Sequence, residues 1–535
     1  MTATMPAELR AAFEEYERAI VADDVPVLDA SFAPGPATMR GDHTGLLVGH
    51  DAISAFRSGR GGVPPRTIER VEYRPLGEGG DVALLVSTSR YRAGGTGLQT
   101  QVWQRIDGRW LITAAHVSPR AQPLDRSIWR TVGDPLRPAA AEGPLTGLTV
   151  AVKDLFAISG HRIGAGNPTF LDAARVERTT APAAADLLQG GAAVRGIART
   201  DEFAYSMAGD NPHYGTPPNG ALPGALPGGS SSGAASAVAT GQADVALATD
   251  TAGSIRVPAS YQGLWGLRTT HGLVSTHGVL PLAPSFDTVG WIARDGETLQ
   301  RVVDWSLRGG ERERPASDLQ DAELPRRFAV PVELLADLDP ATLDAFSAFT
   351  DALRTLTDSA AHDLSVIDVS LGAPEEFAAT FRTLQAAEAW RAHGSWVRRH
   401  EGALGAAVAE RFRRAAAVTP EEEAEALTVA ASLRDRIRRL VLDDVLLLPT
   451  VPGPAPSRSA GEFATERTRQ ATMRLTTPAS IAGLPSVTAP LLTVASRLGP
   501  APVGVSLIGR PGSDAALVRL ARRLMTSMTQ RTEEQ

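Results

Sequence analysis

The first 118 residues begin with helical periodicity and then change to strand periodicity. Apolar side chains recur at helical spacing between about Ala7 and Ala22, which predicts a first helix. Two shorter helices are expected next, over ADDVPVLDASF and HDAISAFRSG, and four strand-like runs follow. The last two runs, LQTQVWQRID and GRWLITAAHVS, meet at Asp107-Gly108, which is a strong hairpin signal. Residues 1–118 are therefore predicted to form a small α+β domain with a curved sheet closed over a pocket.

Residues 119–143 have no sustained hydrophobic period. This stretch, PRAQPLDRSIWRTVGDPLRPAAAEG, is rich in proline, arginine and alanine, so we predict a linker in which Trp129 contacts one of the two flanking domains. From residue 144 onward, apolar strand-like runs such as GLTVAVK and VLLLP alternate with helical patterns. Residues 374–440 read as helical, interrupted at Gly394 and Pro420. The pattern over 144–535 predicts a large mixed sheet between layers of helices.

Residues 228–260 are the most distinctive segment of the chain, GGSSSGAASAVATGQADVALATDTAGSIRVPAS. The small-residue run AASAVATG predicts a tightly packed helix, and ADVALATD predicts a buried strand. A second helix is expected to begin near Ser254, after the turn that starts at Asp250. Small residues let a substrate approach the backbone, and a helix N-terminus leaves N–H groups free to bind an oxyanion. This segment therefore suits nucleophilic chemistry by a serine.

Composition narrows the class of protein. The apolar content of 43% is enough for a real core, and 535 residues make a single domain unexpected. The net charge is −7 and no basic tract is present, which argues against a nucleic-acid partner. No apolar run is long enough for a membrane span, and the acidic N-terminal stretch does not resemble a signal peptide. Cysteine is absent, which excludes disulfides and a thiol nucleophile and fits a cytoplasmic enzyme. No metal or cofactor motif is found, so we expect neither.

Lysine is almost absent from the chain. Lys153 is the one lysine among 53 lysine and arginine residues, and it ends the apolar run GLTVAVK. Arginine has replaced lysine everywhere else, and a surface cation at this position could have been replaced as well. A desolvated lysine can lose its proton, whereas arginine cannot. We therefore predict that Lys153 acts as a neutral base.

A serine nucleophile requires a group that accepts its proton. Ten histidines are present, so a Ser–His–acid triad is not excluded by composition. However, Ser254 does not lie in a G-x-S-x-G elbow. A lysine base with a second serine as relay fits these residues better.

The motifs V-K-D, GGSSSG and D-T-A-G-S-I-R resemble those of the amidase signature family. The resemblance covers roughly residues 144–535 and is nearest to the indole-3-acetamide hydrolase branch, as indicated by AVKDLFAISG, GAGNPTF and GLVSTHGVLPLAPSFDTVGW. It implies an α/β/α sandwich around a large mixed sheet and a Ser–cis-Ser–Lys triad. In this chain Ser254 is then the nucleophile, Ser230 the bridging serine and Lys153 the base.

The same resemblance implies an oxyanion hole and a substrate pocket. The oxyanion donors would be the backbone N–H groups of Thr251, Ala252, Gly253 and Ser254. Tyr205 and Met207 lie where the family walls its acyl pocket, although a plain core role is equally compatible with each. Two residues depart from the family pattern, because Ser232 and Ala252 both stand where glycine is usual. A Cβ at residue 252 disfavours positive φ and narrows the space beside the oxyanion hole.

The N-terminal domain resembles the SnoaL-like cone fold and, within it, the AtzH-like subunits that accompany amidases. The resemblance rests on FEEYERAIVADD, GHDAISAFR, QTQVWQR and WLITAAHVS. Arg40, Arg57 and His116 are candidates to line the cone and bind an anion, against a purely structural role. We expect this domain to dock, dimerise or gate, and we expect the chain to form a homodimer.

Four more polar residues are candidates for a functional or a structural role. His213 could serve as a base, although no acidic residue lies at a sequence spacing that would identify it as a partner. Asp154 is expected either to orient a neighbour or to cap a loop. Arg256 is expected to pair with Asp250 and stabilise the turn, and so to support Ser254 indirectly. Asp287, in SFDTVGW, is expected to be structural.

Together these features predict an amidase that hydrolyses a small-molecule carboxamide through an acyl-enzyme, with the amide and water as its partners. A biuret- or carboxybiuret-type hydrolase is the alternative enzyme, suggested by the AtzH-like domain. An inactive scaffold protein with an amidase fold is the alternative outside enzymes. Amide transfer to tRNA is disfavoured because no nucleic-acid surface is expected.

Overall fold

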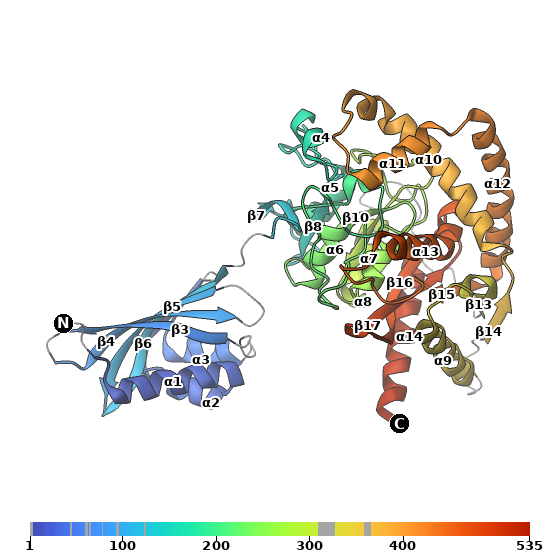
Figure 1. Cartoon of the computed structure of the whole chain (residues 1–535). Coiled ribbons are helices and arrows are strands. Elements are labelled where there is room, and N and C mark those ends of the chain that lie inside the picture. Colours follow the sequence, from blue (N-terminus) through green and yellow to red (C-terminus); the bar gives the residue numbers. More distant parts are fainter. Residues whose placement is uncertain are drawn as a thin grey trace. The chain divides into compact units, whose positions relative to one another are not determined.

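The chain forms two units, residues 1–125 and 126–535, each with its own core. The computed structural model describes residues 4–42, 45–58, 63, 66–77, 79–91, 96–121, 125–308, 327–357 and 365–534. No helix in these ranges is both long enough and apolar enough to cross a bilayer. Figure 1 labels helices and strands of both units.

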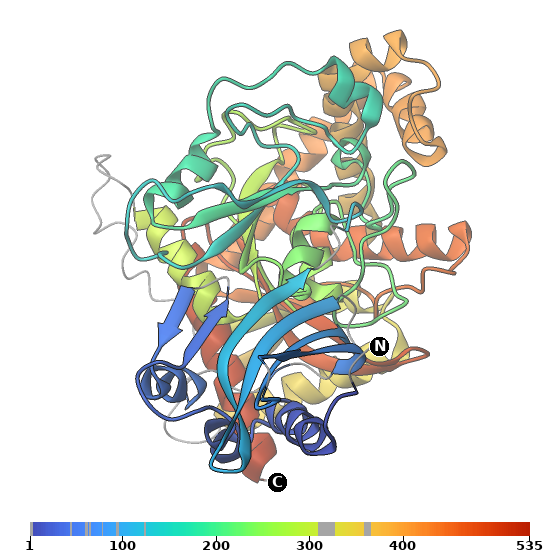
Figure 2. The ribbon, with the colours of Figure 1, turned by 90° about the vertical axis from the view of Figure 1, so that its left-hand side faces the viewer.

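The N-terminal unit packs three helices against a curved sheet (Figure 2). The helices are α1 (Ala7–Ala22), α2 (Val25–Ala30) and α3 (His50–Ser58). The strands are β1 (Met39–Asp42), β2 (Gly45–Val48), β3 (Arg66–Leu76), β4 (Val82–Tyr91), β5 (Thr96–Ile106) and β6 (Arg109–Ala121), in the order β2-β1-β6-β5-β4-β3. The predicted first helix and the hairpin at Asp107-Gly108 are confirmed, since Ile106 pairs with Arg109. The short strands β1 and β2 were not predicted.

The second unit is built on an eleven-stranded mixed sheet. Its order is β14-β13-β15-β17-β16-β11-β12-β10-β8-β9-β7. The strands are β7 (Trp129–Arg137), β8 (Thr149–Lys153), β9 (Ala193–Ala198), β10 (Val245–Asp250), β11 (Trp265–Arg268), β12 (Thr288–Ala293), β13 (Arg327–Pro331), β14 (Ser365–Val369), β15 (Val445–Pro449), β16 (Ser486–Ser496) and β17 (Gly499–Ile508). The central strands are buried on both faces, as the unbroken burial of β10 and β12 shows.

Helices cover both faces of this sheet. They are α4 (Pro168–Ala173), α5 (Pro182–Gln189), α6 (Ser232–Ala239), α7 (Arg256–Tyr261), α8 (Gly296–Arg308), α9 (Pro340–Thr357), α10 (Pro374–Arg399), α11 (Ala406–Ala416), α12 (Pro420–Asp443), α13 (Glu462–Ala482) and α14 (Asp514–Glu534). Alternate residues of β10 point to opposite faces: Ala246 and Ala248 pack with α6 and α7, whereas Val245 and Leu247 join the core that contains α8 and α14. The predicted α/β/α sandwich is confirmed.

Two predictions about this unit were wrong in detail. Residues 129–137, assigned to the linker, form strand β7, which pairs with β9 at the edge of the sheet. Trp129 is buried there and donates a hydrogen bond to Gln242 at 2.7 Å. Gly394 does not interrupt the helical region, because α10 runs through it; the actual breaks lie at residues 400–405 and 417–419. Helices α10, α11 and α12 lie together (Figure 1).

Candidate active site

The pairing of β8 with β10 brings the lysine and the serine segment together. The two strands are parallel neighbours, with Val245 opposite Val150 and Leu247 opposite Val152. Lys153 is the last residue of β8 and Asp250 the last of β10. The carboxyl ends of parallel strands meet at one edge of a sheet, which is where ligands bind in open α/β folds. The chain thus places its single lysine beside the turn that leads to Ser254.

Lys153 is fully buried and bonded to two hydroxyl groups. Its Nζ lies 2.9 Å from Ser230 Oγ and 2.8 Å from Thr249 Oγ1. Burial lowers the pKa of Lys153 from 10.5 to about 7, against the opposing charges of Asp201, Asp250 and Asp287. The amine is therefore available in its neutral form near pH 7. Sequence reasoning missed Thr249, because only the strand register shows that it faces the lysine.

Ser230 and Ser254 are held close through the backbone. The peptide bond between Gly229 and Ser230 is cis. The N–H of Ser231 donates to the carbonyl oxygen of Ser254 at 3.3 Å, and the N–H of Asp201 donates to that of Ser230 at 3.1 Å. Within the described ranges no hydrogen bond joins the Ser230 and Ser254 hydroxyl groups. Both serines are buried, and Ser254 is 3% exposed.

A buried ion-pair cluster fixes the turn that precedes Ser254. The two carboxylate oxygens of Asp250 accept hydrogen bonds from Arg256 Nη2 at 2.8 Å and from Arg256 Nε at 3.0 Å. Asp250 Oδ1 also accepts one from Arg268 Nη1 at 3.0 Å. The N–H of Ile255 donates to the same carboxylate at 3.1 Å. The two guanidinium groups hold the pKa of Asp250 well below its usual range in spite of burial. The predicted pair of Arg256 with Asp250 is confirmed, whereas Arg268, from β11, was missed.

The turn leaves four backbone N–H groups without an acceptor. No described residue accepts a hydrogen bond from the N–H groups of Thr251, Ala252, Gly253 or Ser254. The positive φ of this turn falls on Gly253, at 138°, and Ala252 keeps a negative φ. Ala252 therefore does not adopt the left-handed conformation that its Cβ would disfavour. These N–H groups are therefore available to donate hydrogen bonds to a ligand.

Ser232 has a partner that explains its departure from glycine. Its Oγ donates to Asp201 Oδ1 at 2.8 Å, and the N–H of Gly209 donates to Oδ2 at 3.0 Å. A Cβ on Gly229 would lie 2.2 Å from Asp201 Oδ2, so the carboxylate fills the space beside that glycine. Burial raises the pKa of Asp201. Asp201 was missed by sequence reasoning, and it links the loop before Ser230 to the start of α6.

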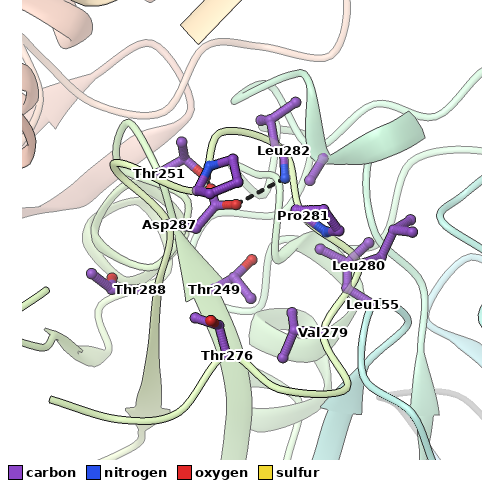
Figure 3. A pocket seen from close by; sticks show the side chains of 12 residues that line it. Leu155, Thr249, Thr251, Thr276, Val279, Leu280, Pro281, Leu282, Asp287 and Thr288 are labelled. Carbon is purple, nitrogen blue, oxygen red and sulfur yellow. Dashed lines mark hydrogen bonds between the residues drawn. The ribbon is translucent and has the colours of Figure 1, made fainter. Parts of the chain in front are cut away.

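A small cavity of about 190 Å³ adjoins the lysine side of the site (Figure 3). It is lined by Leu155, Ala204, Thr249, Thr251, Thr276, Val279, Leu280, Pro281, Leu282, Pro284, Asp287 and Thr288. Asp287 accepts hydrogen bonds from Thr251 Oγ1 at 2.6 Å and from the N–H of Leu282 at 2.8 Å, the bond drawn in Figure 3. Burial raises its pKa. Asp287 thus bonds Thr251, the first residue of the turn, which agrees with the structural role expected for it.

A larger cavity of about 770 Å³ is lined by residues of the segment 202–212 and of helices α7, α11 and α13. Met207 lines it, and the carbonyl oxygen of Met207 accepts the N–H of Gly229 at 2.9 Å. Val257, three residues after Ser254, lines it as well. Tyr205 is not among the lining residues and instead packs edge-on against Phe412, with ring centroids 5.3 Å apart. Burial raises the pKa of Tyr205 to about 12. Of the predicted substrate-binding pair, the structure places Met207 at a cavity and Tyr205 in the aromatic core.

Two further candidates have structural partners. His213 Nε2 lies 2.6 Å from Glu202 Oε1, in a network that Asn167 joins at 2.7 Å, and the residues bonded to Lys153 do not include it. Asp154 forms a buried ion pair with Arg130 of β7 at 3.0 Å. Burial raises its pKa to about 6, against the charge of Arg130. Asp154 therefore contacts a neighbouring side chain, and its Oδ1 also accepts the N–H of Gly164 in the following loop at 2.9 Å, so each of the two predicted roles has a contact that supports it.

The three cone candidates do not form one site. Arg40 is buried, pairs with Asp42 at 2.8 Å and lies over an aromatic ring. Arg57 is buried with its guanidinium 4.5 Å from the centre of the Phe32 ring. His116 is exposed on β6, because it follows the buried Ala115 and so points to the opposite face. The prediction that His116 lines the cone is wrong.

Comparisons with known proteins match both units. The family model described as Amidase matches residues 132–518, and the one described as AtzH-like matches residues 2–122. Amidase 1 of Arabidopsis thaliana is 35% identical over 410 residues, which cover 73% of this chain and 95% of the relative. The 1-carboxybiuret hydrolase subunit AtzE of Pseudomonas sp. (strain ADP) is 33% identical over 403 residues, covering 71% and 84%. A solved structure described as a crystal structure of amidase is 27% identical, covers 75% of this chain and 92% of its own, and superposes with a TM-score of 0.64.

Proposed function

Because the chain belongs to the amidase family, whose members hydrolyse C–N bonds of amides, we propose that it converts a small-molecule carboxamide to a carboxylic acid and ammonia. The proposal assigns the reaction to Ser254, Ser230 and Lys153, with an acyl-enzyme on Ser254. The observation that carries it is the buried Lys153 amine, with a pKa of about 7, at 2.9 Å from the Ser230 hydroxyl. An amine that only balanced charge would not need to be neutral.

The proposed acylation step moves one proton along the two serines. The lone pair of neutral Lys153 accepts the Ser230 proton, and Ser230 accepts the proton of Ser254. Ser254 Oγ forms a bond to the amide carbon, and the carbonyl π electrons move to oxygen. The N–H groups of residues 251–254 then bind the oxyanion. Catalytic hydrogen bonds often shorten only when substrate is bound, which accounts for the missing Ser230–Ser254 contact.

The second half of the reaction reverses this transfer. The C–N bond breaks as the oxyanion returns its electrons, and Ser230 gives a proton to the leaving nitrogen, which departs as ammonia. Water then attacks the ester carbonyl while Ser230 and Lys153 accept its proton. Cleavage of the C–Oγ bond releases the acid, and Ser230 returns the proton to Ser254 Oγ while Lys153 returns one to Ser230, which restores the Ser254 hydroxyl and the neutral lysine.

Two alternatives have support of their own. Hydrolysis of a biuret- or carboxybiuret-type compound is favoured by the AtzH-like unit and by the 33% identity to the AtzE subunit. An inactive scaffold protein would not need a lysine that is desolvated and bonded to two hydroxyl groups, so the site argues against it.

Ammonia release from a panel of amides tests these functions. The panel contains indole-3-acetamide, phenylacetamide, short aliphatic amides, biuret and allophanate, with Ser254→Ala as the blank. Turnover of carboxamides supports the first proposal, and turnover confined to biuret and allophanate favours the alternative. Lys153→Arg keeps the charge but cannot give up a proton, so wild-type turnover in that variant would eliminate the proposed base.

We also propose a homodimer formed through the N-terminal unit. Met39, Leu46 and Val48 of β1 and the edge strand β2 are 43%, 66% and 55% exposed, which is unusual for neighbouring apolar side chains. A solution mass equal to one chain would dispose of the dimer, and Leu46→Glu is expected to convert a dimer to monomers.

A further inference from the structure

The larger cavity is lined by four arginines and four carboxylates. They are Arg411, Arg414, Arg458, Arg469, Glu202, Asp210, Glu410 and Glu466. Their formal charges cancel, so the character of the cavity depends on which charges are already paired. Two of the arginines face a carboxylate directly: Arg414 pairs with Glu410 at 2.7 Å, and Arg469 forms a two-point pair with Glu466 at 2.6 and 2.8 Å.

The other two carboxylates are also satisfied. Glu202 is 1% exposed and accepts hydrogen bonds from Asn167 at 2.7 Å and from the N–H of Gly405 at 3.0 Å. Asp210 is exposed and accepts the Thr216 hydroxyl at 2.7 Å. No carboxylate of the cavity wall therefore needs an additional cation.

Two cations of this wall, Arg411 and Arg458, have no carboxylate partner among the described residues. Arg458 is exposed and bonds the carbonyl oxygens of Ala225 and Pro217, whereas Arg411 is half-buried. Arg411 Nη1 donates to the main-chain carbonyl of Tyr205 at 2.7 Å, and no described carboxylate lies within ion-pair distance of Arg411.

Glu466 acts on Arg411 only at longer range and is itself engaged by Arg469. Burial and the charge of Arg469 lower the pKa of Arg411, yet a guanidinium remains protonated in proteins. A half-buried cation bonded only to a neutral carbonyl is a favourable partner for an anion.

The position of Arg411 connects it to the proposed active site. Its acceptor, Tyr205, is two residues before Met207, whose carbonyl bonds the residue that precedes Ser230. The charge of Asp201 acts on both Lys153 and Arg411. The cavity thus extends from Met207 and from Val257, three residues after Ser254, to α11. The volume of about 770 Å³ falls in the range of small-molecule sites, whereas the 190 Å³ cavity does not.

We propose that Arg411 binds the carboxylate of the substrate, and that this enzyme acts on amides that carry a carboxylate away from the scissile bond. This inference rests on the proposed amide hydrolysis at Ser254. An arginine fork recognises a planar carboxylate through two parallel hydrogen bonds, and it leaves the amide end free to lie near Ser254. Simple neutral amides of the same length lack this interaction.

The test separates binding from turnover. Ligands are the monoamides of succinic, glutaric and adipic acid, each matched with an analogue in which a methyl ketone replaces the carboxylate. Their binding to the Ser254→Ala chain is measured by calorimetry, so that no hydrolysis is needed. We expect at least one monoamide to bind about 10- to 100-fold more tightly than its ketone, as charge-assisted hydrogen bonds provide.

Two substitutions in α11 locate the effect. Arg411→Gln removes the charge but keeps an N–H donor for the Tyr205 carbonyl, and we expect it to abolish the preference. Arg413→Gln is the matched control, because Arg413 lies on the same helix with a 74% exposed side chain and pairs with Glu410. It should leave the preference intact. In the otherwise wild-type chain, Arg411→Gln should raise KM for the monoamides, whereas Arg413→Gln should leave it nearly unchanged.

The outcomes are distinguishable. Equal binding of monoamides and ketones to the Ser254→Ala chain overturns the anion site, and so does an equal loss for both in Arg411→Gln. Hydrolysis of both series without preference would reject the anion site and leave the proposed amidase function standing. Tight, Arg411-dependent binding without hydrolysis would support the anion site and reject the proposed amidase function. If Arg411→Gln fails to fold, the comparison of the two ligand series on Ser254→Ala still decides.

Discussion

The acid limb of the pH–rate profile is predicted to report the ionisation of Lys153. The pKa of this side chain falls from 10.5 to about 7 because the ammonium is excluded from water. One pKa unit corresponds to 1.36 kcal/mol, so the protein disfavours the ammonium by about 5 kcal/mol relative to water. The carboxylates of Asp201, Asp250 and Asp287 act in the opposite direction and keep the pKa from falling further.

The size of the expected change follows from this value. Only the neutral amine can accept the Ser230 proton, so kcat/KM should fall about tenfold per pH unit below pH 7. At pH 5 roughly 1% of the lysine is neutral, and the rate should be about 100-fold below its plateau. Without burial the limb would lie near pH 10, and the enzyme would be almost inactive at neutral pH.

Initial rates of ammonia release between pH 5 and 9 measure this limb, with the best amide found in the substrate panel. Asp154 is the neighbour that could produce a similar limb, because burial raises its pKa to about 6. If Lys153 is the titrating group, Asp154→Asn can lower the rate, but the midpoint of the acid limb should stay near pH 7. Lys153→Arg should reduce the plateau by about 10²- to 10⁴-fold and remove the limb.

A profile that stays flat from pH 5 to 8 would refute the reasoning. So would a limb that disappears in Asp154→Asn, or one that persists unchanged in the residual activity of Lys153→Arg. Each result would mean that the buried lysine is not the group whose proton is transferred.

Further predictions test the residues around the lysine. Thr249→Val removes the second partner of Lys153 Nζ, and kcat should fall about fivefold with KM unchanged, as expected for one hydrogen bond of about 1 kcal/mol; steady-state kinetics measures both. Arg268→Met leaves Asp250 incompletely paired in the core and should lower the free energy of unfolding by about 3–5 kcal/mol, seen as a lower denaturant midpoint. Ser232→Gly removes a donor to a buried carboxylate and should cost about 1–3 kcal/mol in the same assay. Because the folded pKa of Lys153, about 7, lies below its value of 10.5 in the unfolded chain, the unfolded chain binds more protons between these values, and stability should rise with pH from about 7 to 10.5; Lys153→Met should lose that slope.

Local elements were predictable because their signals lie within a few residues. Helix α1 and the β5–β6 hairpin follow from spacing and from Asp107-Gly108, and both were found at the predicted places. Strand β7 was missed for a physical reason. It pairs on one side only, with β9 at the edge of the sheet, and its pairing is irregular, so it needs neither alternation nor freedom from proline.

Partners that depend on strand register could not be predicted. Thr249 faces Lys153, and Arg268 reaches Asp250, because β8, β10 and β11 belong to one sheet. No short-range pattern records which residues of two distant strands lie opposite each other. The same limit explains the wrong placement of His116, whose direction depends on the alternation along β6. Residue types indicated the candidate catalytic residues, whereas the contacts between distant strands required the topology.

The glycines that this chain retains and those it has replaced differ in the space around them. At Gly229 a Cβ would lie 2.2 Å from Asp201 Oδ2, and at Gly253 the positive φ and a contact of 3.1 Å to α7 exclude a side chain. Ser232, by contrast, uses its extra atoms to bond Asp201, and Ala252 is 5% exposed within the core at a negative φ. A side chain is therefore accommodated at residues 232 and 252, whereas at residues 229 and 253 it would meet Asp201 or a strained backbone. It follows that Ser232→Gly should be tolerated with a loss of stability, whereas Gly229→Ala should abolish turnover by moving Asp201, and equal effects of the two changes on kcat would contradict this account.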